Sequence, residues 1–365
     1  MGILPTLGAD NLMRTLFVGD LHAKADLLPL ITRVARREHA ERIVLLGDIC
    51  DDWNVSNNGL VRFFDTFAAW YRRESLEREV IPLLGNHDVP YFLKQGSSSY
   101  ARVRALAPGF KPGAHRKVHE LMQNIPFQLA WSDGNILATH AGLTRAWGRR
   151  RLGADYMDMP VEEVADRLNR MLLHPASLVV PMTDIGPARG GAGTPSPLWC
   201  DRGEFAEDGD MHLTQVVGHT PVPTVLHEHD AWFCDTFSTM SNGTPIGDGS
   251  LLMYSESGFY PVPLLADLLS SGLLPFFKAR LESKTNNTRR KNTKTLTTSS
   301  RTAQAKHRRR TPDGRFADEL NSFGFPDAAT LSAYEQQTSQ IPVLQRLQKH
   351  GKITPPPITL PDGWT

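Results

Sequence analysis

Eight side chains that can bind metal ions or move protons lie at the ends of five short apolar runs. The runs are TLFVGDLH (15–22), RIVLLGDICDDW (42–53), VIPLLGNHD (80–88), NILATHAG (135–142) and TQVVGHTPV (214–222). The side chains are Asp20, His22, Asp48, Asn86, His87, Asp88, His140 and His219. Oxygen and imidazole donors without a thiolate suit Mn²⁺, Fe or Zn²⁺. Two such ions, about 3.5–4 Å apart, can clamp a phosphate group and lower the pKa of an attacking water.

The elements that carry these side chains can be read from the same runs. Each run has several aliphatic or β-branched residues and stops at a glycine or a polar turn, which predicts a buried strand opening into a loop. Residues 25–41 and 60–77 show the three- and four-residue apolar spacing of amphipathic helices. Residues 231–237 and 250–257 are further candidate strands. Alternating strands and helices indicate the α/β class, with active groups beyond the carboxyl ends of the strands.

The composition indicates a protein with an ordinary core and no membrane contact. Of the 365 residues, 40% are hydrophobic and 22% are charged. No apolar stretch approaches the roughly 18 residues of a membrane-spanning helix, and the first residues do not resemble a secretory signal. Three cysteines without metal-binding spacing argue against a disulfide framework. We therefore expect a cytoplasmic protein.

A strongly basic segment interrupts an otherwise acidic chain. Residues 284–310 carry ten Lys or Arg and no Asp or Glu, which leaves 30 basic and 39 acidic residues elsewhere. Because the segment has little to bury, we expect a basic disordered linker over 278–312, able to contact nucleic acid or another polyanion weakly. Residues 313–365 would form a small C-terminal element. The less regular 143–213, with its Gly/Pro-rich stretch, would be an insertion or lid.

Five short motifs follow the apolar runs in a fixed order. They are GDLH (19–22), GDICD (47–51), GNHD (85–88), THAG (139–142) and GHT (218–220). In this order they resemble the calcineurin-like metallophosphoesterase superfamily. The resemblance implies an α/β domain over 1–277, folded as a four-layer αββα sandwich, with two divalent ions on its strand-end loops.

The resemblance also implies which residues bind the two ions. Asp48 would bridge them. The other implied ligands are Asp20 and His22 for the first ion and Asn86, His140 and His219 for the second. No thiolate is among them, so the pair would be Mn, Fe or Zn.

His87 matches the histidine that gives a proton to the leaving oxygen. An imidazole suits this role because its unperturbed pKa, about 6.5, lies near operating pH. A carboxylate bound to the far ring nitrogen would fix its tautomer. Asp51 matches the residue with that role in the protein phosphatase branch, and Asp88 is the local alternative.

Two features resemble the serine/threonine protein phosphatase and diadenosine tetraphosphatase branch. The last motif continues with Pro221, where nuclease and many nucleotidase branches have a second histidine. The stretch SPLWCDRGEF (196–205) resembles the Trp and Arg that precede this motif in the branch. Arg202 is therefore a candidate for a fork-like grip on phosphate oxygens.

The second motif departs from this branch, where it reads Gly-Asp-x-x-Asp-Arg-Gly and its Arg helps to bind phosphate. This chain has Asp52 and Trp53 there, and GDICDDW also resembles the lipid A pathway pyrophosphatases. Because an acid alone cannot hold a phosphate dianion, Arg189 or Arg202 would have to supply the charge. Trp53 is either a pocket residue that stacks on an aromatic substrate or an ordinary rim residue.

The favoured function is hydrolysis of a phosphate monoester, on a phosphoprotein or a nucleotide-like substrate, by metal-bound hydroxide with His87 as general acid. The alternative is a phosphodiesterase or nuclease acting on nucleic acid, or an enzyme with a pyrophosphate substrate. A binding module that keeps only the scaffold is disfavoured, because every expected ligand position holds a competent residue.

Overall fold

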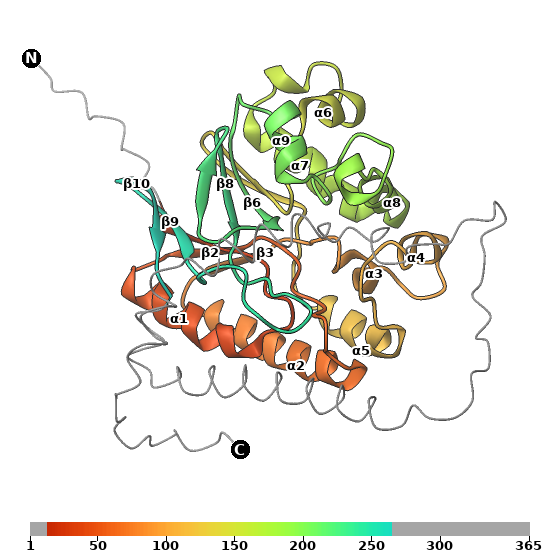
Figure 1. Ribbon diagram of the computed structural model, residues 1–365, viewed down its shortest axis with the longest axis vertical. Coiled ribbons are helices and arrows are strands. Elements are labelled where there is room, and N and C mark those ends of the chain that lie inside the picture. Colours follow the sequence, from red (N-terminus) through yellow and green to blue (C-terminus); the bar gives the residue numbers. More distant parts are fainter. Residues whose placement is uncertain (1–12, 265–365) are drawn as a thin grey trace, which may run out of the picture.

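The computed structural model describes residues 13–264, which form two five-stranded β-sheets between layers of helices (Figure 1). The first sheet has the order β10-β9-β1-β2-β3. Its strands are β1 (Thr15–Val18), β2 (Arg42–Leu45), β3 (Glu79–Pro82), β9 (Leu251–Ser255) and β10 (Gly258–Val262). The second sheet has the order β4-β5-β6-β8-β7. Its strands are β4 (Ala130–Asp133), β5 (Ile136–Thr139), β6 (Thr214–Pro221), β7 (Leu226–Glu228) and β8 (Ala231–Asp235).

The five apolar runs of the sequence form β1, β2, β3, β5 and β6. The strands β1, β2 and β3 pair in parallel, and so do β5, β6 and β8. Their carboxyl ends therefore meet along one edge of each sheet, which is where the metal-capable residues follow them. The expected strands at 231–237 and 250–257 are β8 and β9.

Side chains alternate between two buried layers along the central strands. Phe17 and Val44 of the first sheet share a buried cluster with Val216 of the second, so the sheets pack face to face. Their neighbours Leu16 and Val217 belong to clusters on the outer faces. Because successive side chains of a strand point to opposite faces, both sheets are covered on both sides. This confirms the four-layer αββα sandwich.

Two long helices, α1 (Leu28–Arg37) and α2 (Asn57–Glu74), lie along the first sheet (Figure 1). Ser56 caps α2 by accepting a hydrogen bond from the Gly59 amide, and the helix buries a row of aromatic residues in the same cluster as Leu16. The remaining helices of this half are η1 (Ala25–Leu27), α3 (Val89–Phe92), α4 (Ser98–Val103) and α5 (Pro112–Met122).

Residues 143–213, expected as an insertion or lid, form helices over the outer face of the second sheet (Figure 1). They are α6 (Arg145–Arg151), η2 (Tyr156–Asp158), α7 (Val161–Arg170), η3 (Met171–Leu173), α8 (Pro175–Thr183), η4 (Pro187–Arg189) and α9 (Arg202–Asp208). Phe205 of α9 packs edge-on against Phe233 of β8, with ring centroids 5.8 Å apart. The region is thus a layer of the sandwich.

Two expectations fall beyond this part of the chain. The linker over 278–312 and the element over 313–365 lie outside the described residues, as does the end of the expected 1–277 domain. Within 13–264, no helix combines the length and the apolar character needed to cross a membrane.

Candidate metal and phosphate site

A first group of metal-capable side chains converges on His140, which follows β5. Its Nε2 lies 3.0 Å from both Asn86 Oδ1 and His219 Nδ1, and 3.5 Å from Asp48 Oδ2. The other ring nitrogen, Nδ1, is 2.8 Å from the carbonyl oxygen of Leu46. Because a carbonyl only accepts, Nδ1 carries the proton and Nε2 presents a lone pair to the group, as expected of a metal-binding histidine.

A second group lies beside it, at the end of β1. His22 Nε2 is 3.8 Å from Asp20 Oδ2, and its Nδ1 donates a hydrogen bond to the Asp51 carbonyl. The donor atoms of Asp20, His22 and Asp235 all lie within 4.8 Å of one another, as do those of Asp48, His140 and His219. The expected ligands are therefore brought together, in two adjoining groups.

Sequence reasoning did not find Asp235. Its signal was present, since it is the polar residue that ends the apolar stretch AWFCD of β8. Nothing local separates it from an ordinary strand-end turn residue; only the pairing of β8 beside β6 brings it to the site.

The loops that carry the ligands adopt a backbone conformation that non-glycine residues rarely tolerate. The φ angles of His22, Asp48 and His219 are 44°, 45° and 63°, and Asp51 has 64°. Left-handed non-glycine residues cost free energy and cluster at functional sites. His22, Asp48 and His219 carry metal-capable side chains of the two groups, whereas Asp51 lies outside them.

The buried carboxylates and neutral histidines of the site favour bound cations. Asp20 and Asp48 are at most 2% exposed. Burial, followed by the charges of Asp235 and Asp48, raises the pKa of Asp20 well above its usual range. Burial, together with the charge of Lys24, lowers the pKa of His22 to about 4. The Nε2 atom of buried His219 has no hydrogen-bond partner within 13–264. Burial also lowers the pKa of His219 well below its usual range, so the neutral imidazoles of His22 and His219 stand beside crowded carboxylates, a donor set that two divalent ions would fit.

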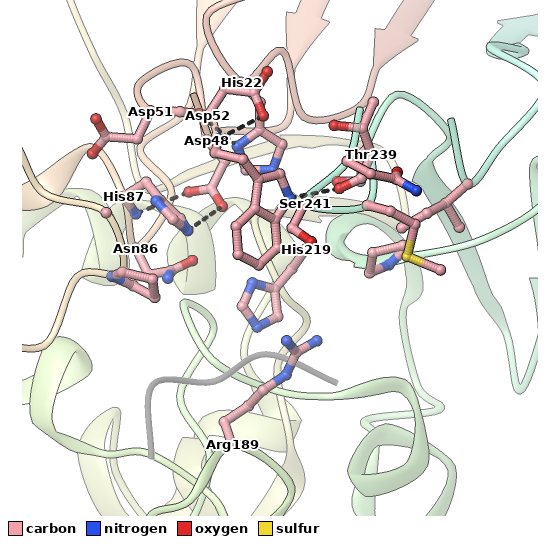
Figure 2. Close-up of a pocket in the computed structure, with 18 residues that line it drawn as sticks. His22, Asp48, Asp51, Asp52, Asn86, His87, Arg189, His219, Thr239 and Ser241 are labelled. Carbon is pink, nitrogen blue, oxygen red and sulfur yellow. Dashed lines mark hydrogen bonds and ion pairs between the residues drawn. The ribbon is translucent and has the colours of Figure 1, made fainter. Parts of the chain in front are cut away.

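His87 lies between the two groups. Its amide donates a hydrogen bond to Asp48 Oδ1 at 3.0 Å, and its Nε2 is 3.8 Å from Asp48 Oδ2 (Figure 2). Burial lowers the pKa of the ring, so its protonated form is a stronger acid than a free imidazolium.

Neither Asp51 nor Asp88, the two carboxylates expected to orient His87, forms a hydrogen bond with it within 13–264. Asp51 accepts hydrogen bonds from the Tyr91 hydroxyl and the Lys111 ammonium group, and Figure 2 shows it pointing away from Asp48. Burial raises the pKa of Asp51 to about 7 although Lys111 opposes the shift.

Asp88 has a different structural task. Its two carboxylate oxygens accept hydrogen bonds from the amides of Ile49, Cys50 and Gly85, at 2.8–3.2 Å. It therefore fastens the GNHD loop to the GDIC loop. These amide hydrogen bonds place Asp88 in the loop structure, and within 13–264 no hydrogen bond joins it to His87.

A cavity of about 410 Å³ opens above these groups (Figure 2). Trp53, which is 42% exposed, and the segment 238–242 form part of its wall, and the Trp53 indole N–H donates to the Thr239 carbonyl at 2.6 Å. Asp52 also lines the cavity, 3.8 Å from the Lys24 ammonium group. Asp52, which follows the GDICD motif, is thus accompanied by a positively charged lysine.

Only one of the two candidate arginines reaches the cavity. Arg189 lines it, 3.0 Å from Asp201, and Figure 2 shows its guanidinium group near His219. Arg202 is not among the lining residues; its guanidinium group lies 3.8 Å from Glu228. Arg189 is therefore the better placed to bind a phosphate oxygen.

Comparisons with known proteins agree with this geometry. A family model described as calcineurin-like phosphoesterase matches residues 13–223. Two curated relatives, symmetrical bis(5'-nucleosyl)-tetraphosphatases from two strains of Aliivibrio fischeri, are 29% and 30% identical over 137 residues. The match covers 37% of this chain and 47% of each relative, so the chain spans about half the length of the curated relatives it matches.

Solved structures similar to this chain include a protein from Thermus thermophilus, with 13% identity and a TM-score of 0.31 over 70% of this chain and 100% of that one. A phosphoesterase from E. coli has 11% identity and a TM-score of 0.29, over 69% of this chain and 93% of that one. The family model covers more than half of the sequence and includes all five motifs. The chain belongs to the calcineurin-like phosphoesterase family.

Proposed function

We propose that this protein is a dimetal phosphoesterase that hydrolyses a phosphate monoester on a nucleotide-like or phosphoprotein substrate. The observation that carries the proposal is the position of Asp48. Its carboxylate lies within 3.8 Å of both the metal-capable His140 and His87, the candidate general acid, and it lines an open cavity. Asp48 therefore adjoins a candidate metal ligand, the candidate general acid and the cavity that would admit the substrate.

The two groups of donor atoms support two metal positions. Asp20, His22 and Asp48 would hold one, and Asp48 with Asn86, His140 and His219 would hold the other. Two bound ions would neutralise phosphate charge and lower the pKa of the attacking water. The oxygen and nitrogen donors support manganese, iron or zinc.

Side chains around the ions would transfer a proton and bind the substrate. His87 would give a proton to the leaving oxygen from Nε2, which lies 3.8 Å from Asp48 Oδ2. Arg189 binds a phosphate oxygen from the opposite wall. Trp53 presents an exposed aromatic face at the rim, which supports a substrate with a base or another ring.

A second candidate substrate is the pyrophosphate linkage of a dinucleoside polyphosphate. The names of the two relatives favour it, over the half of their length that the match covers. Cleavage of nucleic acid, recruited by the basic segment 284–310, is the third possibility and depends on residues outside the described part. A cytoplasmic location is supported by Cys50, Cys200 and Cys234, which are free and buried.

A substrate panel with added Mn²⁺ tests the proposal. Para-nitrophenyl phosphate, its bis-ester, phosphopeptides, nucleotides, dinucleoside polyphosphates and single-stranded DNA would be compared. Monoesters should turn over fastest, and Asp48→Asn should lose both bound metal and activity, whereas His174→Ala, at an exposed site, should lose neither. Preference for the bis-ester or DNA, or full activity of Asp48→Asn, would reject the proposal.

A further inference from the structure

Asp235 occupies the end of β8, directly beside the end of β6. Its register partner is Pro221, two residues after the metal-capable His219. The Asp235 side chain is 1% exposed, and its oxygen lies within 4.8 Å of the donor atoms of both Asp20 and His22. Since Pro221 offers no donor from β6, Asp235 is the side chain that this edge of the second sheet contributes to the group.

The hydrogen bonds of the group leave lone pairs on Asp235 and His22 that can bind a cation. Ser238 donates to Asp235 twice, from its amide to Oδ1 at 3.1 Å and from its hydroxyl to Oδ2 at 2.7 Å. Each carboxylate oxygen therefore keeps a further acceptor direction. His22 uses Nδ1 on the Asp51 carbonyl and keeps its Nε2 lone pair for the group.

The charges of the group also favour a bound cation. Asp20 and Asp235 are both buried, and two carboxylates in such a place need a compensating positive charge. The neighbouring Lys24 ammonium group supplies only part of it, since it also lies 3.8 Å from Asp52. A divalent ion would compensate both acids and use the free lone pair of His22.

We propose that Asp235 is a ligand of the divalent ion held by Asp20 and His22, held in place for that role by Ser238. The inference rests on the dimetal site proposed above and adds to it a donor from β8. It also connects the ion to the cavity wall, because Ser238 begins the segment that carries Thr239 and Ser241 to the rim.

Metal binding by the full chain tests this without an activity assay. Calorimetric titration with Mn²⁺ would be run on the wild type, Asp235→Asn and Ser238→Ala, and metal content would be measured by mass spectrometry. We expect two Mn²⁺ ions in the wild type, and at one of the two sites a loss of affinity in Asp235→Asn of at least about tenfold. Ser238→Ala keeps the carboxylate and removes only a hydrogen bond to it, so it should lose less affinity than Asp235→Asn.

A crystal structure of the Mn²⁺-loaded wild type keeps the test decisive if a variant fails to fold. An Asp235 oxygen about 2.0–2.3 Å from a manganese ion supports the proposal, by comparison with metal–oxygen distances in proteins. Two manganese ions with the Asp235 oxygens beyond about 3 Å, outside that range, or unchanged affinity in Asp235→Asn, would overturn it while leaving the dimetal function standing. Absence of bound manganese would overturn both.

Discussion

The backbone amide of His219 donates hydrogen bonds to both carboxylate oxygens of Asp20, at 3.1 Å each. These residues stand 199 positions apart; Asp20 follows β1 of the first sheet, and His219 lies in β6 of the second. The contact therefore joins the two metal-capable groups by the backbone as well as by side chains.

We expect Gly218→Ala to displace that carboxylate. A Cβ at position 218 would stand 2.1 Å from Asp20 Oδ1, and the buried Asp20 side chain has no solvent to move into. Bound metal and activity should both fall by at least tenfold. Gly203→Ala is the matched control, because its Cβ meets nothing closer than Asp201 Oδ1 at 3.6 Å. Full metal content in Gly218→Ala, measured by mass spectrometry, would contradict this arrangement.

His87→Ala should slow turnover while leaving metal content unchanged. Loss of a general acid costs roughly 10²–10⁴-fold in rate. The loss should be greatest for an alkyl phosphate, whose leaving oxygen needs the proton most, and least for para-nitrophenyl phosphate. Steady-state kinetics on both substrates checks this. An equal loss on both would mean that His87 acts in binding instead.

Arg189→Gln should weaken substrate binding, whereas Arg202→Gln should not. A charged hydrogen bond is worth about 1.5–3 kcal/mol, so KM should rise roughly 10- to 100-fold in the first variant. The second should stay within about twofold because Arg202 faces Glu228 at the surface. Thermal unfolding of both variants controls for loss of the Arg189–Asp201 ion pair. The reverse order of effects would restore Arg202 as the phosphate ligand.

Arg189 and Arg202 illustrate which features of the site could be predicted from the sequence. The strands, and the metal-capable residues that meet after them, were predictable because an apolar run, a glycine and a donor are local signals. The stretch from Asp201 to Glu204 is local as well: the two side chains form a capping box, which makes Arg202 the first residue of α9. This cap indicates a structural place for Arg202, whereas the family resemblance favoured a phosphate contact.

Other features could not be predicted, because they depend on contacts between distant segments. Asp235 reaches the site only through the pairing of β8 with β6. The carboxylate of Asp88 accepts hydrogen bonds from three backbone amides, two of them in a loop nearly 40 positions earlier in the chain. In both cases the sequence offers an acid at a strand end or loop, and the packing of the sheets decides its partner.

Asp88→Ala should therefore destabilise the fold rather than act first on catalysis. It leaves the buried amides of Ile49, Cys50 and Gly85 without an acceptor, at a cost of about 1–3 kcal/mol or more. Asp88→Asn keeps one acceptor oxygen and should lose less. Urea unfolding of the metal-free proteins measures both without interference from bound ions. A stable Asp88→Ala with a low kcat would revive its orienting role for His87.

A last prediction concerns His115, which is buried away from the cavity. Its Nε2 donates to the carbonyl oxygens of Pro90 and Leu93, at 3.1 and 2.9 Å, so the neutral ring has its lone pair on Nδ1. That atom is buried and has no hydrogen-bond partner among the described residues. A second proton would stand there without an acceptor, and burial lowers the pKa of His115 below 6.5.

Because the unfolded chain then binds the proton more readily than the folded one, this group's contribution to stability is complete above pH 6.5 and is lost as the pH falls toward the folded pKa. The free energy of unfolding of the wild type should therefore drop more between pH 7.5 and 5, a range of about 2.5 units around the reference pKa of histidine, than that of His115→Gln. The exposed His174→Gln should follow the wild type. Identical slopes in all three, or a His115 ring that titrates by NMR above the ordinary value of 6.5, would show that Nδ1 finds an acceptor after all.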